Sequence, residues 1–189
     1  MARPLVAVLA AGRGRRFGGG KLETDCAGKP LGRWVIEAVE QAGLEPGLIV
    51  TGPEGVSFAA GWRALVNREP EAGLGSSLAL AARAAFEAGD EALLVLLADM
   101  PLIDPDFLRG LASAPAPAAT RQDDGRPGVP ALLDRTLIAQ AMALSGDRGA
   151  GPLLTGASLW EAPPGALLDV DTVEGLAKVA RVLRPRPAP

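Results

Sequence analysis

Residues 6–21 read Val6-Ala7-Val8-Leu9-Ala10-Ala11-Gly12-Arg13-Gly14-Arg15-Arg16-Phe17-Gly18-Gly19-Gly20-Lys21, an apolar run that breaks into a loop rich in glycine and arginine. An apolar run of this length, bounded by turn residues, predicts a buried strand. Open α/β sheets bind ligands at the carboxyl ends of their strands, where this loop begins. Its free backbone N–H groups and basic side chains favour a phosphate-binding loop, the alternative being a solvated basic loop.

The loop matches neither of the two common phosphate-binding motifs. A dinucleotide fingerprint needs G-x-G-x-x-G, and the first glycines of this loop are one residue too far apart, as G-x-G-x-x-x-G. A P-loop needs G-x-x-x-x-G-K-[ST], but Arg15 stands at its first glycine position and Leu22 follows Lys21. The loop therefore indicates another kind of phosphate site.

Composition limits the classes of protein that this chain can represent. Its 189 residues, 48% hydrophobic and 22% charged, predict a single domain over residues 1–184 and a disordered proline-rich tail over residues 185–189. A net charge of −3 gives no support for binding nucleic acid or a membrane surface. No apolar stretch approaches the roughly 20 residues of a membrane span, and we expect a cytoplasmic protein.

The chain contains no histidine, and Cys26 is its single cysteine. This excludes a Ser-His-Asp or Cys-His couple, a zinc site built on histidine or paired cysteines, and a disulfide within the chain. The remaining chemistry must use carboxylates, lysine, arginine, hydroxyls and hard metal ions. Phosphoryl or nucleotidyl transfer fits that inventory, because positioning and charge neutralisation do most of its catalytic work.

Strand and helix patterns alternate along the chain, which predicts an α/β fold with a mainly parallel sheet. Further strands are expected at Leu48–Thr51, Arg63–Val66 and Ala92–Ala98, a weak one within Ser113–Pro130 beside a turn at Asp124-Gly125, and a last one ending near Asp171. Helices are expected from about Leu31 to Gly43, from Ser76 as N-cap to about Ala88, at Pro105–Ala112, Leu137–Leu144 and Gly149–Leu154, and from Asp171 or Thr172 as cap to about Leu183.

Three aspartates stand at positions where strands end or helices begin. Asp99 ends the most apolar strand, and a buried strand does not end in an unpaired carboxylate without cost. It is predicted to bind magnesium and orient a triphosphate, the alternative being a cap of the turn before Pro101. For Asp171 a metal ligand and a helix cap are equally favoured, and Asp147 is either an N-cap or part of the site.

Six short blocks follow one another in order between residues 5 and 180. They are Leu9-Ala10-Ala11-Gly12-x-x-x-Arg16-Phe17-Gly18, Lys21-Leu22, Gly73-Leu74-Gly75-Ser76-Ser77-Leu78, Ala98-Asp99-Met100-Pro101, Gly146-Asp147-x-Gly149-Ala150 and Asp169-Val170-Asp171-Thr172. Together they resemble the molybdenum cofactor nucleotidyltransferases, a branch of the glycosyltransferase-A-like nucleotidyltransferases. The resemblance implies a Rossmann-like, three-layer α/β/α fold with a mostly parallel sheet.

Within this family the chain is most similar to the cytidylyltransferases. These join CMP from CTP to the phosphate of molybdopterin and release pyrophosphate, so the implied partners are CTP, molybdopterin and a molybdenum hydroxylase. Guanylyltransferase relatives tend to read Leu-Ala-Gly-Gly where this chain has Leu9-Ala10-Ala11-Gly12. A methyl group at Ala11 would narrow the base pocket and favour a pyrimidine.

The resemblance also implies roles for individual residues. Arg16, Lys21 and Asp99 would be catalytic: Arg16 and Lys21 neutralise the triphosphate and the leaving pyrophosphate, while Asp99 holds Mg²⁺ together with Asp171. The nucleotide would be bound by Leu9, Ala10, Ala11, Gly12, Arg13, Lys21, Thr51, Gly75, Ser76, Ser77 and Asp99. The acceptor phosphate itself attacks the α-phosphorus, so no covalent enzyme intermediate is needed.

The chain departs from the family pattern at two places. Gly20 stands where an acidic residue or asparagine usually precedes the loop lysine, and Gly128-Val129-Pro130 has an apolar middle residue in an acceptor-side Gly-x-Pro element. The second departure leaves the acceptor open. Alternatives are therefore a related enzyme that uses GTP or another phosphate acceptor, and a non-catalytic carrier or chaperone that brings finished cofactor to a hydroxylase.

Overall fold

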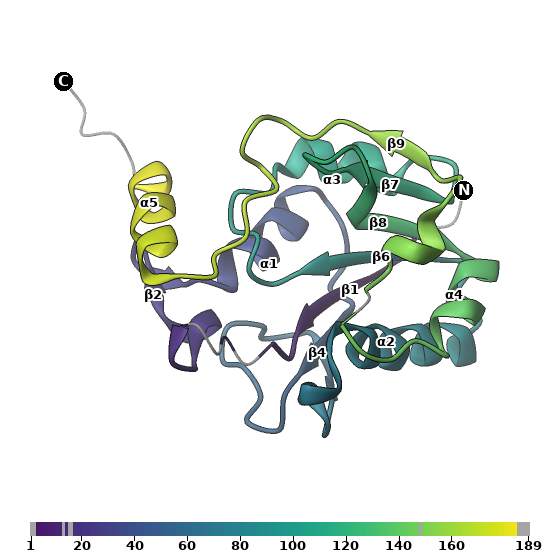
Figure 1. The fold of residues 1–189 in the computed structure, drawn as a ribbon, viewed down its shortest axis with the longest axis horizontal. Coiled ribbons are helices and arrows are strands. Elements are labelled where there is room, and N and C mark those ends of the chain that lie inside the picture. Colours follow the sequence, from purple (N-terminus) through teal and green to yellow (C-terminus); the bar gives the residue numbers. More distant parts are fainter. Residues whose placement is uncertain (1–2, 13, 15–16, 148, 185–189) are drawn as a thin grey trace.

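A computed structural model describes residues 3–12, 14, 17–147 and 149–184, and its centre is a seven-stranded sheet (Figure 1). The strands are β1 (Leu5–Ala10), β4 (Leu48–Thr51), β5 (Arg63–Val66), β6 (Ala92–Leu97), β7 (Ala118–Arg121), β8 (Pro127–Asp134) and β9 (Ser158–Trp160), in the order β5-β4-β1-β6-β8-β7-β9. Every neighbouring pair is parallel except the two that β8 forms with β6 and β7. The predicted α/β fold with a mostly parallel sheet is confirmed.

Helices cover both faces of this sheet (Figure 1). They are α1 (Arg33–Gln41), α2 (Leu74–Ala88), α3 (Pro105–Ala112), α4 (Arg135–Ala141) and α5 (Val173–Leu183), with short 3₁₀ turns at Lys21–Glu23, Pro70–Ala72 and Gly151–Leu154 and a small hairpin of β2 (Asp25–Cys26) and β3 (Lys29–Pro30). Alternate residues of β1 point to opposite faces: Val6 and Val8 pack with α1 and α3, and Ala7 and Leu9 pack with α2. Two cores therefore hold β1 in place.

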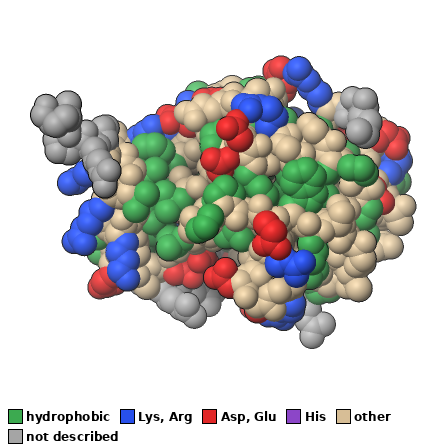
Figure 2. Space-filling model, turned by 90° about the horizontal axis from the view of Figure 1, so that it is seen from above, with side chains coloured by type: hydrophobic (Ala, Val, Ile, Leu, Met, Phe, Trp, Pro, Cys, Tyr) green, Lys and Arg blue, Asp and Glu red, His purple; other side chains and the backbone are tan. Residues whose placement is uncertain are grey.

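The surface carries charges of both signs. Seen from above, acidic and basic side chains are interspersed around an area of hydrophobic side chains in the middle of the face (Figure 2). No helix in the described part of the chain is long and apolar enough to cross a membrane. The expected disordered tail, residues 185–189, lies outside the described residues.

Some of the expected boundaries are wrong, and side-chain hydrogen bonds explain two of them. Helix α2 begins at Leu74 rather than after a Ser76 cap, because the Ser76 hydroxyl donates to the carbonyl of Gly73 inside the first turn, at 2.8 Å. Helix α4 begins before Leu137, because the Asp134 carboxylate caps it by accepting from the Leu137 N–H, at 2.8 Å.

Other elements were missed or misplaced. The residues before Asp171 form no strand among those described. The region Ser113–Pro130, expected to hold one weak strand and a turn, contains β7 and the first half of β8, joined at the predicted turn Asp124-Gly125. Strand β9 and the small β2–β3 hairpin were not predicted. The expected helix over Gly149–Leu154 is a short 3₁₀ turn over Gly151–Leu154.

An ion cluster attaches β3 to α1. The Glu37 carboxylate pairs with the Lys29 ammonium and, at 3.2 Å, with Arg33 Nε, while Lys29 lies 3.7 Å from the centre of the Trp34 ring. Partial burial raises the pKa of Glu37, but the two cations outweigh burial and hold that pKa below its ordinary value. Ionised Glu37 therefore stabilises the fold.

Glu37→Gln is expected to lower the free energy of unfolding by about 0.5–1 kcal/mol near neutral pH. Because the folded pKa is depressed, this stabilisation is present above the unfolded pKa and disappears as pH falls through the folded one. Denaturant unfolding of both proteins at neutral and at acidic pH measures the difference. Glu45→Gln, in an exposed pair with Arg3, is the control. An equal Glu37→Gln penalty at both pH values would contradict the prediction.

Candidate active site

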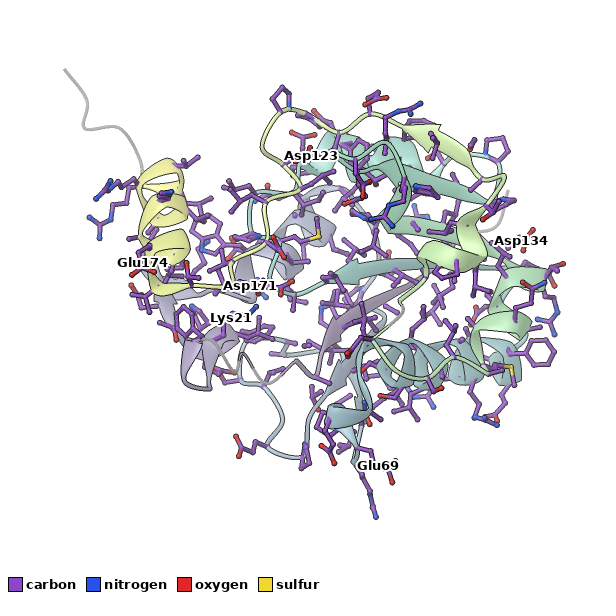
Figure 3. The ribbon with its side chains drawn as sticks, viewed as in Figure 1. Lys21, Glu69, Asp123, Asp134, Asp171 and Glu174 are labelled. Atoms are coloured by element: carbon purple, nitrogen blue, oxygen red, sulfur yellow. The ribbon has the colours of Figure 1, made fainter. Side chains whose placement is uncertain are left out.

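Three charged side chains meet at the carboxyl edge of the sheet. Lys21 Nζ lies 2.8 Å from Asp99 Oδ2 and 3.1 Å from Asp171 Oδ1, and Figure 3 shows Lys21 beside Asp171. Parallel pairing of β1 with β6 sets Asp99 in place, since the Ala98 N–H donates to the carbonyl of Leu9 at 3.0 Å just past the strand ends. Residues 78 and 150 positions away thus converge on the loop lysine.

Two local contacts leave Asp171 available for this cluster. The Val170 N–H donates to the Asp99 carbonyl at 3.0 Å, which holds the segment after residue 167 against the end of β6. Thr172, not Asp171, caps α5, because its hydroxyl accepts from the Gly175 N–H at 3.0 Å. Of the two equally favoured readings of Asp171, the helix cap is therefore excluded.

Burial and neighbouring charges shift the pKa of Lys21 and of the nearby Asp169. Lys21 is only 7% exposed, and burial lowers its pKa, but the paired Asp99 and Asp171 outweigh burial and raise it. Lys21 is therefore a fixed positive charge. Burial, with the like charges of Asp171 and Asp99, raises the pKa of Asp169.

The two carboxylates fit a divalent cation. Asp99 Oδ1 is buried and has no hydrogen-bond partner, although its other oxygen pairs with Lys21, so one hard oxygen ligand is free. This also argues against the alternative of a turn cap before Pro101. Among the described residues no three or more His, Cys, Asp or Glu side chains form a metal cage. Mg²⁺ is commonly held by one or two carboxylates together with substrate phosphates and water, which such a pair allows.

Glycine geometry brings the loop lysine into the cluster. Gly20, before Lys21, has φ 62°, a left-handed conformation that glycine adopts at no cost and asparagine tolerates. This explains why Gly20 can replace the asparagine of the family pattern. At Gly14 (φ 54°) an added Cβ would lie 2.9 Å from Lys21 Cβ, so the loop passes directly over the lysine stem.

A cavity of about 270 Å³ opens beside the cluster. Its walls are largely apolar, with Lys21, Asp99 and Asp147 as charged members; the lining residues are Leu9, Ala11, Gly12, Lys21, Leu22, Pro70, Gly73, Leu74, Ser77, Leu97, Asp99 and Asp147. A slot with apolar walls and a charged region suits a flat ring joined to phosphates.

Asn67, which the sequence patterns did not single out, shapes one wall of this cavity. Its buried side-chain amide donates to the hydroxyls of Ser76 (2.8 Å) and Ser77 (3.0 Å), and its carbonyl oxygen accepts from the Glu69 N–H at 3.0 Å. Asn67 thus fixes the 69–73 turn against the first turn of α2. The only sequence signal was its place at the start of a turn-rich segment.

The remaining predicted site residues occupy varied places. Ala10 lines a second cavity of about 450 Å³ between the loop and residues 52–56. Thr51 is buried at the end of β4, with its hydroxyl unpaired. Neither of these two cavities is lined by Thr51, Gly75, Ser76 or Asp171. The predicted Arg13 and Arg16 lie outside the described residues.

A bidentate contact fixes Glu23, which lines the second cavity. Both the N–H and the hydroxyl of Ser57 donate to the two carboxylate oxygens of Glu23, each at 2.6 Å. Glu23 ends the 3₁₀ turn that begins with Lys21, so this contact ties the lysine turn to the loop after β4. Neither residue was predicted from the sequence.

The arrangement can hold a nucleoside triphosphate. An apolar slot lies beside a buried lysine and two carboxylates, at the strand ends where open α/β sheets bind ligands. Charge neutralisation and positioning are what nucleotidyl transfer requires. A non-catalytic carrier would need neither the unpaired Asp99 oxygen nor the buried Lys21. These two features therefore favour an enzyme over the carrier alternative.

Comparisons with known proteins agree with this geometry. Residues 6–162 match the MobA-like NTP transferase domain. The chain is 30% identical to "Purine catabolism protein PucB" of Bacillus subtilis (strain 168), over 93% of this chain and 95% of that protein. It is 37% identical to a "Probable molybdenum cofactor guanylyltransferase" of Thermococcus kodakarensis, over 54% of this chain and 49% of that protein.

Solved structures share the fold. A nucleotidyl transferase from Methanothermobacter thermautotroptrophicus superposes with a TM-score of 0.79 at 23% identity, covering 96% of this chain and 98% of that one. The matched segment contains the loop, Lys21, Asp99 and the α2 turn. The chain therefore belongs to the MobA-like NTP transferase domain family and is a nucleotidyltransferase.

Proposed function

We propose that this protein is a cytoplasmic, Mg²⁺-dependent CTP:molybdopterin cytidylyltransferase. The observation that carries the proposal is the cluster of Lys21, Asp99 and Asp171 beside a cavity lined by Ala11. The cluster supports transfer of a nucleotidyl group, and Ala11 supports a pyrimidine base. A relative named for molybdenum cofactor guanylyl transfer supports molybdopterin as acceptor.

Ala11 supports the choice of base by its position. It is almost fully buried at 6% exposure and lines both cavities beside the loop, so its methyl group takes volume from the space where a base would lie. The neighbouring Gly12 has open space around its Cβ position. A glycine at position 11 would leave a wider slot, which suits a purine.

A third cavity supports the acceptor side of the proposal. About 700 Å³ in volume, it lies between the β7–β8 turn, including Asp123 and Asp124, and residues 161–169. Asp169, on its wall, is two residues from Asp171, and Figure 3 shows Asp123 on the turn away from Lys21. Carboxylates accept hydrogen bonds from ring N–H and amino groups, which a pterin carries at its edge. Gly128 and Val129 lie behind this turn, in β8.

The residues of the chain suit an in-line displacement. An acceptor phosphate oxygen forms the new bond to the α-phosphorus of CTP, and the bond to the bridging oxygen breaks, so pyrophosphate leaves with the electron pair. Lys21 is placed to neutralise charge on the phosphates, and Asn67 keeps the base-side wall in position. A divalent cation held by Asp99 and Asp171 would supply further charge neutralisation and align the phosphates.

Two measurements test the proposal. Thermal melting with Mg²⁺ and CTP, GTP, ATP or UTP is expected to show the largest stabilisation with CTP, because a ligand that binds only the folded state raises its stability. Pyrophosphate release with molybdopterin is expected to be fastest with CTP. A larger melting-temperature shift and faster pyrophosphate release with GTP would show that the enzyme uses GTP rather than CTP. No pyrophosphate release with any nucleotide would favour the carrier role.

A further inference from the structure

The segment after α4 forms a wall of the 270 Å³ cavity, and glycines on both sides make this contact close. The Gly75 N–H donates to the Gly146 carbonyl at 2.9 Å. An added Cβ at Gly73 (φ 90°) would lie 2.4 Å from the Gly146 carbonyl carbon and oxygen, and one at Gly149 would lie 2.8 Å from Leu74 Cδ2. No side chain fits between the two segments at these points.

This contact holds the Asp147 carboxylate against the cavity. Asp147 Oδ1 would lie 2.6 Å from a Cβ at Gly73, so the carboxylate rests on the turn that lines the cavity. The other two charged lining residues, Lys21 and Asp99, pair with each other. Within the described part of the chain, Asp147 forms neither a hydrogen bond nor an ion pair, and it caps no helix, since the 3₁₀ turn that follows starts at Gly151.

We infer that Asp147 is a specificity-determining residue that reads the nucleobase by accepting a hydrogen bond from the exocyclic amine of cytosine. This rests on the proposed function, in which the base in this cavity is cytosine. An ionised carboxylate only accepts hydrogen bonds. It pairs with the N4 amine of cytosine but meets the O4 acceptor of uracil with repulsion. Asp147 thereby excludes UTP. Ala11 cannot make this distinction, because cytosine and uracil are nearly the same size.

Nucleotide binding without acceptor tests this inference. Titration calorimetry of the full chain with CTP and with UTP, in Mg²⁺, is expected to show tighter binding of CTP by about tenfold or more. In Asp147→Asn the amide can donate to O4 of uracil, so the preference is expected to fall to near one. In Asp147→Ala both the hydrogen bond to N4 and the repulsion of O4 are lost, so CTP affinity is expected to fall and UTP affinity to rise, which also brings the preference near one.

Asp106→Asn is the matched control, since Asp106 is exposed in the first turn of α3, which packs on the opposite face of the sheet. Its ratio of CTP to UTP affinity is expected to equal that of the wild type. A wild-type preference for CTP that survives in Asp147→Asn would overturn the role of Asp147 and leave the proposed function standing. A wild type that binds UTP as tightly as CTP would overturn both. Unchanged melting temperatures show that the variants are folded.

Discussion

Replacement of Asp99 by asparagine is expected to slow pyrophosphate release roughly a thousandfold while CTP still binds. Asp99 lines the cavity, pairs with the loop lysine and carries the unpaired carboxylate oxygen. Its Oδ2 pairs with Lys21 at 2.8 Å, and its Oδ1 is buried without a partner. Asparagine keeps the shape of the side chain but supplies one neutral oxygen, so both the cation ligand and the charge that balances Lys21 are lost.

The experiment separates binding from chemistry. Pyrophosphate release gives the rate, and calorimetric titration with CTP gives the affinity, which the apolar walls and Lys21 should largely maintain. Asp106→Asn is again the control and is expected to retain wild-type rates. Asp99→Asn with more than about a tenth of the wild-type rate would contradict a role for this carboxylate in the chemical step.

The α/β class could be predicted from the sequence because β1 and β6 are uniformly apolar, as buried parallel strands are. Strand β8 could not. Pro127, Gly128 and Pro130 read as turn residues, since proline cannot donate to a ladder. The structure accommodates them by a shift of register between Ala119 and Thr120, where the Thr120 hydroxyl donates to the Pro130 carbonyl at 2.6 Å. This adjustment depends on contacts between strands distant in the sequence, so no local sequence pattern could have predicted it.

The candidate site, like the fold, could be predicted from the sequence only in part. Asp99 and Lys21 could be proposed because each directly follows a strand or its loop, and strand ends share one edge of a parallel sheet. Their pairing could not be foreseen, because it depends on how the glycine loop folds back over the lysine stem at Gly14. Asn67 was missed for a related reason: its two serine partners stand nine and ten residues away, across a turn whose course only the structure shows.

Lys21→Met is expected to have two effects of opposite sign. Catalysis should fall by roughly 10²–10³-fold, because methionine keeps the apolar stem but removes the positive charge beside the phosphates. The affinity for a divalent cation in the absence of nucleotide should rise by about tenfold, because the Lys21 ammonium, at 2.8 Å from Asp99 and 3.1 Å from Asp171, competes for the same carboxylates.

The stability of the variant provides a third measurement. Without the ammonium, Asp99 and Asp171 repel each other, and we expect the free energy of unfolding to fall by about 2 kcal/mol, or about 4–8 °C in melting temperature. Mn²⁺ should restore most of this loss, because it replaces the missing charge and binds only the folded protein. Lys178→Met, exposed on α5, is the control, and neither its stability nor its Mn²⁺ response should change.

Mn²⁺ titration followed by electron paramagnetic resonance measures the affinity directly. If Lys21→Met binds Mn²⁺ no more tightly than the wild type, the lysine does not occupy the cation's place, and its raised pKa reflects a purely structural ion pair. If it binds Mn²⁺ more tightly yet remains inactive, the ammonium has two roles. It holds the two carboxylates together before the substrate arrives. Once a cation takes its place between them, the ammonium pairs with the phosphates instead.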